Sequence, residues 1–408
     1  MKLPIRLQLS TMMFLNYFVW GAWYVTIGTY MGKSLGFTGG QVGSIYATNA
    51  IAAIISPFFV GMIADRFFPS QRVLGVLHIL GAIFMFAATQ TTDFGLFYVL
   101  ILLYNLSFMP TLALTNSLSF NQMDDPQQEF PAVRVLGTIG WIVAGLLIGN
   151  LAIEATAQPL MLAAGAATAM GIFSFFLPHT PPKAKGQQVS VREVLGLDAL
   201  GLLKRRDFAT VVLASVLICI PLAFYYAFAN PFLNEIGFEN AAGRMTLGQV
   251  SEALFLLVMP LFFARLGVKW MLTIGMGAWA LRYLLFAYGG VETGSWMLFA
   301  GIILHGICYD FFFVTGQIYV DNEAPAHLKS SVQGLITLAT YGLGMFIGSN
   351  VSGLIVDQYA MDGGHDWTSV WLIPAAFAGV VLLGFILLFR QKKDTKPEPS
   401  PAVESPAR

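Results

Sequence analysis

The sequence predicts an all-α membrane protein with twelve transmembrane helices arranged as two six-helix bundles. Only 11% of the 408 residues are charged, whereas soluble proteins carry roughly 25% charged residues. Twelve separate apolar runs are each long enough, at about 20 residues, to cross a bilayer as a helix. One long polar segment divides these runs six and six. Most of the protein surface is therefore expected to face lipid.

The twelve apolar runs are continuous and do not alternate between polar and apolar residues. They therefore indicate helices and not the strands of a membrane barrel. Most connections between them are short, which makes successive helices antiparallel neighbours. The predicted runs cover 11–31, 41–64, 73–91, 95–119, 131–153 and 159–178, and then 208–233, 245–264, 270–290, 296–320, 330–357 and 370–390.

The longest internal connection begins at His179, where the sequence reads His-Thr-Pro-Pro-Lys, and it ends after Lys204-Arg-Arg. A polar linker between two helical halves is typical of a transporter built from two bundles. We expect an N-terminal six-helix bundle at 1–178, a cytoplasmic linker at 179–207 and a C-terminal six-helix bundle at 208–390. The last segment, 391–408, is rich in Pro, Lys, Glu and Ser and is expected to be a disordered cytoplasmic tail.

The distribution of Lys and Arg predicts the orientation. With the N-terminus in the cytoplasm, the inner segments hold 18 of the 22 basic residues, and the outer loops hold only Lys33 and Arg244. The remaining two, Arg134 and Arg282, lie inside apolar runs. Short cytoplasmic loops carry an excess of Lys and Arg. We therefore expect a multi-pass protein of the cell inner membrane with both termini in the cytoplasm.

Several classes of function lack support in the sequence. The net charge is zero, so no bulk field attracts nucleic acid. Cys219 and Cys308 both lie in apolar runs and suggest neither a disulfide framework nor a metal pair. No GxxxxGK[ST] phosphate loop is present, which argues against ATP-driven transport by this chain alone. We expect no enzyme, no cofactor and no metal site, and we expect a monomer in the lipid bilayer.

Four charged residues lie in the interior of apolar runs, away from the ends: Arg134, Glu252, Arg282 and Asp310. A charge in hydrocarbon costs about 2.5–3.5 kcal/mol on insertion scales, so such residues usually face a cavity or a partner. Two cations and two carboxylates can simply neutralise one another. The alternative is a polar cavity that binds a solute.

Helical spacing favours the cavity. Arg134, Thr138 and Trp141 are spaced i, i+4 and i+7, so one helical face presents a cation, a hydroxyl and an indole. Aromatic rings stack on a flat ring, while amides and carboxylates accept hydroxyl protons. These faces therefore suit a solute with a flat ring and several hydroxyls. The same reasoning adds Gln249 with Glu252, His305 with Tyr309 and Asp310, and Trp20 in a stripe with Asn16 and Trp23.

A buried carboxyl group also suits coupling of transport to protons, because alternating exposure lets it load a proton on one side and release it on the other. The membrane potential supplies about 2.3 kcal/mol per charge per 100 mV. Glu252 and Asp310 are the candidates. We assign Asp310 to the proton and Glu252 mainly to the solute.

The connection from Gly61 to Arg72 resembles the G-x-x-x-D-R motif of the major facilitator superfamily. The resemblance implies the fold of that superfamily, with twelve helices in two bundles. It also implies a cytoplasmic charge latch between helices. The residues of that latch are Gly61, Asp65, Arg66 and Arg72.

A closer resemblance covers nearly the whole chain. The stretches that begin at Phe18, Met109, Arg134 and Leu195, together with Gly248-Gln-Val-Ser-Glu, are similar to the bacterial nucleoside:proton symporter family of nucleoside permeases. So is the stretch from Gly306 to Phe312, and the sequence looks nearest to a less characterised branch of that family. The resemblance implies proton-coupled nucleoside uptake, and it places on cavity-lining positions Arg134, Thr138, Trp141, Gln249, Glu252, Tyr309 and Asp310.

Two positions depart from the family pattern. Phe224-Tyr-Tyr226 stands where the permeases carry amide side chains, and His305 stands where an aromatic hydroxyl is familiar. We include Tyr226 and His305 among the expected solute-binding residues. A symporter of a sugar or another small polar solute stays open as an alternative, because aromatic rings and amides also bind sugars. A transport-dead membrane receptor or sensor is a further alternative from a different class.

Overall fold

The computed structural model of the chain describes residues 2–59, 67–181 and 196–390. The described residues are mostly helical, and the sheet among them is one small hairpin. Their first part forms α1 (Leu3–Gly21), α2 (Ile27–Lys33), α3 (Gly39–Phe59), α4 (Ser70–Ala88), α5 (Phe94–Asn121), α6 (Pro126–Leu151) and α7 (Gln158–Ser174).

The second part begins with a short 3₁₀ helix and contains two stretches of wider π-helix, η3 and η5, within longer helices. Its elements are η2 (Leu197–Lys204), α9 (Arg206–Glu235), α10 (Ala241–Tyr288), α11 (Ser295–Ile303), α12 (His305–Tyr309), η3 (Asp310–Val314), α13 (Thr315–Glu323), η4 (Ala326–Leu328), α14 (Lys329–Thr337), η5 (Leu338–Gly344), α15 (Met345–Gln358), β1 (Ala360–Met361), β2 (Gly364–His365) and α16 (Trp367–Leu388).

The predicted class, an all-α membrane protein, is confirmed. Among the described residues, eight helices are long and apolar enough to cross a membrane. The apolar faces of these helices leave many large side chains uncovered, including Leu257, Leu354 and Leu387 at 65% exposure or more. Side chains of this kind suit a lipid environment, in which no water has to be excluded. The count of twelve spans stays a prediction.

One of these predicted runs differs from the helices that form. The run 11–31 is not one continuous helix, because α1 ends at Gly21 and α2 begins only at Ile27. A Cβ atom on Gly21 would lie 3.0 Å from the Cα atom of Trp141 in α6, so glycine allows this close approach, and glycine also weakens a helix. The predicted runs 245–264 and 270–290 form two helices, which share the label α10 and are separated by a kink at Gly267, whose φ of 66° is not helical.

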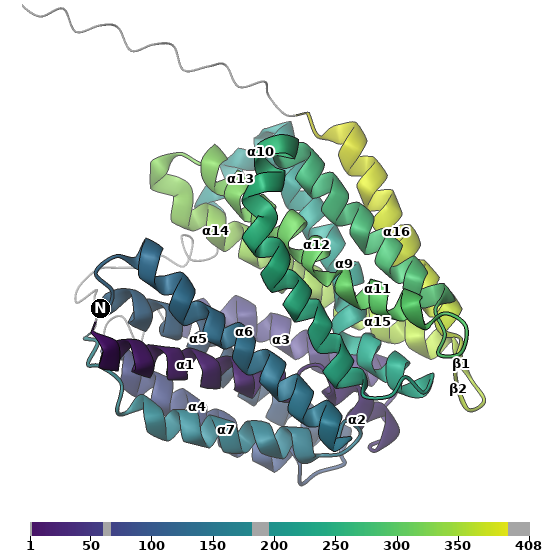
Figure 1. The fold of residues 1–408 in the computed structure, drawn as a ribbon, viewed down its shortest axis with the longest axis horizontal. Coiled ribbons are helices and arrows are strands. Elements are labelled where there is room, and N and C mark those ends of the chain that lie inside the picture. The colour runs from purple at the N-terminus through teal and green to yellow at the C-terminus, as the bar shows by residue number, and fades with distance from the viewer. Residues whose placement is uncertain (1, 60–66, 182–195, 391–408) are drawn as a thin grey trace, which may run out of the picture.

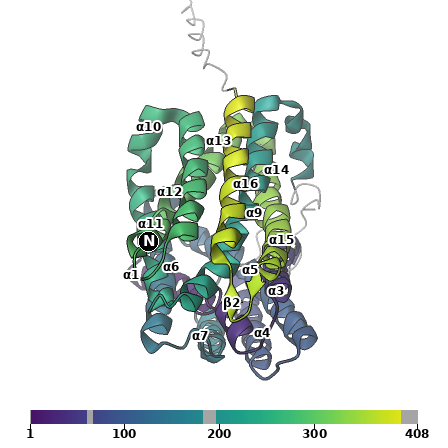
Figure 2. The ribbon, with the colours of Figure 1, turned by 90° about the vertical axis from the view of Figure 1, so that its right-hand side faces the viewer.

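The helices gather into two groups. Figure 1 shows α1–α7 together as the first helix group and α9–α16 together as the second helix group. Contacts between the groups run through the pairs α3 with α15, α6 with α10, and α2 with α9. Figure 2 shows the groups from the side, with hairpin β1–β2 at the end where α2 meets α9.

A buried carboxylate from the first group binds the second group at this end. Glu154, between α6 and α7, is only 5% exposed. It accepts hydrogen bonds from the side-chain amides of Asn230 and Asn234, each at 2.7 Å, and from the backbone N–H of Ala242 at 2.9 Å. The N–H of Ala242 lies at the start of α10, where a helix favours negative charge.

A second carboxylate makes the reciprocal contact. Asp357, near the end of α15, accepts the backbone N–H groups of Gly39 at 2.5 Å and Gly40 at 2.7 Å, at the start of α3. Each helix group therefore supplies a carboxylate that caps a helix of the other group. The hydroxyl of Thr29 adds a hydrogen bond to Asn230 at 2.6 Å. We call Glu154 and Asp357, with these partners, the clasp.

Some sequence predictions lie outside the described residues. These are three residues of the predicted latch, most of the linker and the whole tail. The fourth latch residue, Arg72, is exposed near the start of α4. The predictions that lie outside concern Gly61, Asp65, Arg66, the linker segment 182–195 and the tail 391–408.

Candidate functional site

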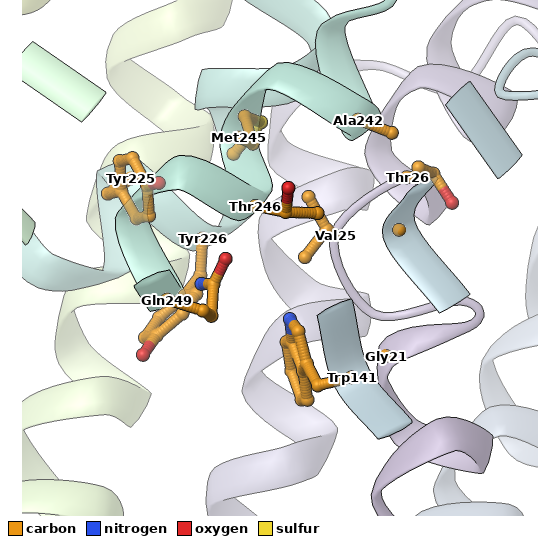
Figure 3. Close-up of a pocket in the computed structure, with 11 residues that line it drawn as sticks. Gly21, Val25, Thr26, Trp141, Tyr225, Tyr226, Ala242, Met245, Thr246 and Gln249 are labelled. Carbon is orange, nitrogen blue, oxygen red and sulfur yellow. The ribbon is translucent and has the colours of Figure 1, made fainter. Parts of the chain in front are cut away.

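A pocket lies between the two helix groups, where the break between α1 and α2 faces α6, α9 and α10 (Figure 3). Its cavity volume is about 10 Å³, so in this state the lining side chains lie close together. We call it the central pocket. Three predicted solute-binding residues line it: Trp141, Tyr226 and Gln249. The remaining lining residues are Gly21, Val25, Thr26, Gly145, Tyr225, Ala242, Met245 and Thr246.

Aromatic rings from three helices stand together at this pocket. The rings of Trp20 and Trp141 meet edge to face, with centroids 5.3 Å apart. Tyr24 contacts both, and its ring centroid lies 5.4 Å from that of Tyr226 on α9. In edge-to-face and tilted pairs the two ring faces do not cover each other completely, and a flat solute can stack on them. The structure therefore brings the rings of Trp20, Trp141 and Tyr226 together, while their role in binding a solute stays a prediction.

Arg134 and Thr138 continue the same face of α6 away from Trp141. The guanidinium carbon of Arg134 lies 4.1 Å from the ring centroid of Tyr17, a cation–π contact. The charge of Arg134 also acts on Glu252 across the space between α6 and α10. Thr138 is half-buried one turn after Arg134. Opposite charges from the two helix groups thus face one another beside the pocket.

Glu252, His305 and Arg282 form a connected row inside the second helix group. The distance from His305 Nε2 to Glu252 Oε2 is 3.6 Å, and that from His305 Nδ1 to Arg282 Nη1 is 3.1 Å. The side chains of His305 and Arg282 are buried, whereas that of Glu252 is 31% exposed. The ring of His305 stacks on Tyr225 with centroids 5.4 Å apart. The row therefore leads from the protein interior to the space between the groups.

Asp310 lies at the start of the π-helical stretch η3 and is 1% exposed. Among the described residues, its Oδ2 atom has no hydrogen-bond partner. Its charge acts on that of Glu252, so ionisation of one carboxyl makes ionisation of the other more costly. Such π-bulges are frequent at functional sites. The hydroxyl oxygens of the neighbouring Tyr309 and of Tyr341 lie 2.5 Å apart and form a hydrogen bond.

The predicted stripe of Asn16, Trp20 and Trp23 is not one functional face. Asn16 Oδ1 receives hydrogen bonds from His78 at 2.9 Å and from the hydroxyl of Thr111 at 3.1 Å, inside the first helix group. The indole N–H of Trp23 donates to the hydroxyl of Tyr104 at 3.0 Å. Since α1 ends at Gly21, Trp23 no longer follows the helical face of Trp20.

Sequence reasoning missed several residues of the site. Arg282 stood out as a buried charge, but spacing gave it no partner. Tyr24 follows Trp20 by four residues, and this helical spacing is a signal that could have indicated it. Tyr225 and Tyr341 meet their partners only through tertiary packing, for which a single sequence carries no signal.

Comparison with known proteins gives a consistent result. Residues 1–394 match the family described as nucleoside H⁺ symporter. The chain is similar to YegT of Escherichia coli, with 44% identity over 94% of this chain and 93% of that protein. It is 34% identical to the xanthosine permease of the same organism, over 97% of this chain and 98% of the permease. For the nucleoside permease NupG, also from Escherichia coli, identity is 33% over 95% and 96%.

Solved structures agree with these relatives. A crystal structure of nucleoside transporter NupG matches with a TM-score of 0.89 and 33% identity, over 95% of this chain and all of that one. A POT family transporter matches with a TM-score of 0.73 at 14% identity, over 94% and 95% of the two chains. The second likeness concerns the fold alone.

Proposed function

Because the chain belongs to the nucleoside H⁺ symporter family, whose members are transporters and not enzymes, we propose that it imports nucleosides together with protons across the inner membrane. Transport proceeds by alternating access between two six-helix bundles, 1–178 and 208–390, in the major facilitator superfamily fold. The chain works as a monomer with both termini in the cytoplasm. The excess of Lys and Arg in the predicted inner segments supports this orientation.

The observation that carries the proposal is the composition of the central pocket, which joins aromatic rings and polar side chains from both helix groups. Trp20, Trp141 and Tyr226 provide faces and edges for a nucleobase. Gln249 reaches the same pocket with an amide, which both donates and accepts hydrogen bonds. A nucleoside combines a flat aromatic base with several ribose hydroxyls. The base matches the aromatic rings of the pocket, and the hydroxyls match its polar side chains.

Of the charged and polar residues near the pocket, some are assigned to binding the solute and one to carrying the proton. Arg134, Thr138 and Glu252 offer donors and acceptors to ribose hydroxyls beside the pocket, and His305 and Tyr309 extend this polar surface. Asp310 carries the coupling proton, supported by its unpartnered Oδ2 atom and by its electrostatic link to Glu252. Reorientation of the bundles changes the exposure of both carboxyls, and with it the cost of their charges.

The clasp identifies the state of the transport cycle. Among the described residues, the side-chain hydrogen bonds that join the two helix groups all lie at the clasp end of the molecule. In the proposed orientation this end faces outward. The structure then represents an inward-facing state, in which the outer entrance is closed.

Uptake into proteoliposomes tests the proposal. Radiolabelled uridine and adenosine are supplied with and without an inward proton gradient. We expect the gradient to stimulate uptake of at least one of them, and we expect Glu252→Gln and Arg134→Ala to abolish the stimulation in folded protein. Absence of uptake of either nucleoside by reconstituted, folded protein would contradict the nucleoside assignment.

A sugar or another polyol remains the second candidate, because Tyr226 stands where family members carry an amide and aromatic rings also stack on sugars. Competition experiments separate the two candidates. Free ribose in excess should leave uridine uptake unchanged if the nucleobase is recognised. Ribose that competes as well as uridine does would favour the sugar.

A further inference from the structure

The two ring nitrogens of His305 have different neighbours. Nδ1 lies 3.1 Å from Nη1 of Arg282, within hydrogen-bond distance. A guanidinium group has N–H donors and no acceptor, so Nδ1 has to accept this hydrogen bond. A nitrogen that accepts carries no proton. The proton of the neutral ring is therefore on Nε2.

Arg282 is a permanent donor at this place. It is fully buried, and its guanidinium carbon lies 3.4 Å from the ring centroid of Tyr225 and 5.4 Å from that of Trp279. The faces of these rings stabilise a desolvated cation. An arginine side chain is not deprotonated in proteins. Arg282 therefore offers His305 hydrogen-bond donors and no acceptor.

The other nitrogen, Nε2, faces Glu252. Its distance of 3.6 Å from Oε2 is too long for a hydrogen bond. His305 is only 2% exposed, so a bound molecule reaches this N–H from the side of Glu252, whose side chain is 31% exposed. The charged or titratable groups around the ring are Arg282 and Glu252 from α10, Tyr225 from α9 and Tyr309 on its own helix. A second ring proton, on Nδ1, would point directly at the guanidinium of Arg282.

We propose that Arg282 is a positioning residue that holds His305 as the neutral Nε2–H tautomer. His305 is thereby a constant hydrogen-bond donor to a carbonyl or ring-nitrogen acceptor of the solute, next to the carboxylate of Glu252. The side-by-side donor and acceptor match the edge of a nucleobase, on which N–H and acceptor atoms are neighbours. This inference rests on the proposed function, since it takes the solute to be a nucleoside bound between the helix groups.

Nitrogen-15 NMR of the protein in liposomes, labelled only at histidine, tests the tautomer without any solute. The chain has five histidines, and the spectrum of the His305→Gln variant assigns the His305 signals by their loss. At neutral pH we expect a protonated Nε2 and an unprotonated Nδ1. A ring protonated on Nδ1, alone or together with Nε2, overturns the proposal, whatever the transport assays give.

Variants of Arg282 test the cause. Arg282→Lys keeps a donor and should preserve the Nε2–H tautomer, whereas Arg282→Met should let the Nδ1–H tautomer appear. An unchanged tautomer in folded Arg282→Met protein would refute the positioning role. If Arg282→Met does not fold, the spectrum of the wild-type protein still decides the tautomer, and Arg282→Lys still tests whether a donor at this position is sufficient.

Solute binding completes the test. Gln at position 305 can accept from Arg282 and donate toward Glu252, whereas Phe can do neither. Loss of one hydrogen bond of about 1.4 kcal/mol lowers affinity roughly tenfold. His305→Phe should therefore weaken uridine binding about tenfold in calorimetry, and His305→Gln should restore most of it. Equal binding by both variants would contradict a donor role, while failure of wild-type protein to bind any nucleoside would instead contradict the proposed function.

Discussion

At the scale of single residues, the central pocket depends on aromatic side chains that have few ways to move. Trp141 is held by Trp20 at a centroid distance of 5.3 Å and by Tyr24 at 6.3 Å. Its indole is thus positioned before any solute arrives. A preformed surface avoids part of the entropy cost of binding. Trp141 is therefore the aromatic residue whose removal should affect binding most.

Truncation of Trp141 measures this contribution. Stacking of a base on an aromatic ring is worth about 1–3 kcal/mol, so Trp141→Ala should weaken nucleoside binding by roughly tenfold or more. Trp141→Phe keeps a ring and should bind nearly as well as wild type. The matched control is Trp296→Ala, because Trp296 is 62% exposed on α11. Equal calorimetric affinity of the Trp141→Ala and Trp296→Ala proteins would contradict a stacking role.

The two carboxyls should separate binding from coupling. Asp310→Asn removes the proposed proton carrier and leaves the pocket lining intact, so nucleoside binding should persist while the proton gradient no longer stimulates uptake. Glu252→Gln should impair both, because Glu252 faces the solute as well. Asp362→Asn, at the exposed tip of the hairpin, serves as the control. Gradient-stimulated uptake by Asp310→Asn at the wild-type level would rule out Asp310 as the carrier.

Spacing along the sequence singled out Trp141, which lines the central pocket, together with Arg134 and Thr138 on the same helix. It failed where partners come from different helices. Glu154 is an example, since it follows an apolar run and looks like an ordinary loop residue. Only tertiary structure brings it to Asn230, Asn234 and Ala242.

At the scale of helices, the clasp joins the end of one helix to the start of another. Hydrogen bonds to a charged group contribute about 1.5–3 kcal/mol each. Glu154 and Asp357 together accept five such bonds across the two groups. Opening of the outer entrance has to break them, and the clasp therefore sets part of the balance between the two states.

Weakening the clasp should shift that balance. The double variant Glu154→Gln with Asp357→Asn should increase the outward-open population by about tenfold or more, given these hydrogen-bond energies. Spin labels at Thr91→Cys and Met361→Cys report the change as a longer distance. Both native cysteines are buried and free, so a background without them is the control. An unchanged distance distribution would show that the clasp does not hold the outer end closed.

The close packing of α3 on α15 should contribute to the thermal stability of the protein. A Cβ atom on Gly43 would meet the backbone of Ser349 and lie 3.2 Å from the Cα atom of Gly353. Overpacking of this kind typically costs about 1–3 kcal/mol. Gly43→Leu should therefore lower the melting temperature of the purified protein. Gly384→Leu, at a position with open space around it, should not, and equal melting temperatures would contradict the close packing.

Hydropathy predicted where helices lie but not where they break. The run 11–31 is uniformly apolar, yet the helix ends at Gly21 because α6 approaches there. By contrast, 245–264 and 270–290 were expected to be separate helices, and a kink at Gly267 does separate them. The break at Gly21 arises at a glycine whose role depends on a neighbouring helix. Composition averaged over a window does not contain that information.

At the scale of the whole molecule, the protein has a closed end at the clasp, a pocket between the two helix groups, and carboxyl groups beside that pocket. Composition and the apolar runs were sufficient to predict the membrane class, whereas the division at residues 179–207 stays a prediction. Closure at the clasp end could not be predicted from them, because it depends on which of two states the helix groups adopt. In the proposed mechanism, the solute and the proton both bind between the two helix groups and cross the membrane in the same direction.

The central claim is the coupling of nucleoside and proton movement in one cycle. It is tested most directly by proteoliposomes that enclose a pH-sensitive dye and start without a proton gradient. Addition of uridine or adenosine outside should acidify the interior as nucleoside enters, and Asp310→Asn protein should abolish the acidification. Nucleoside entry at the wild-type rate without any acidification would contradict the account and identify a uniporter.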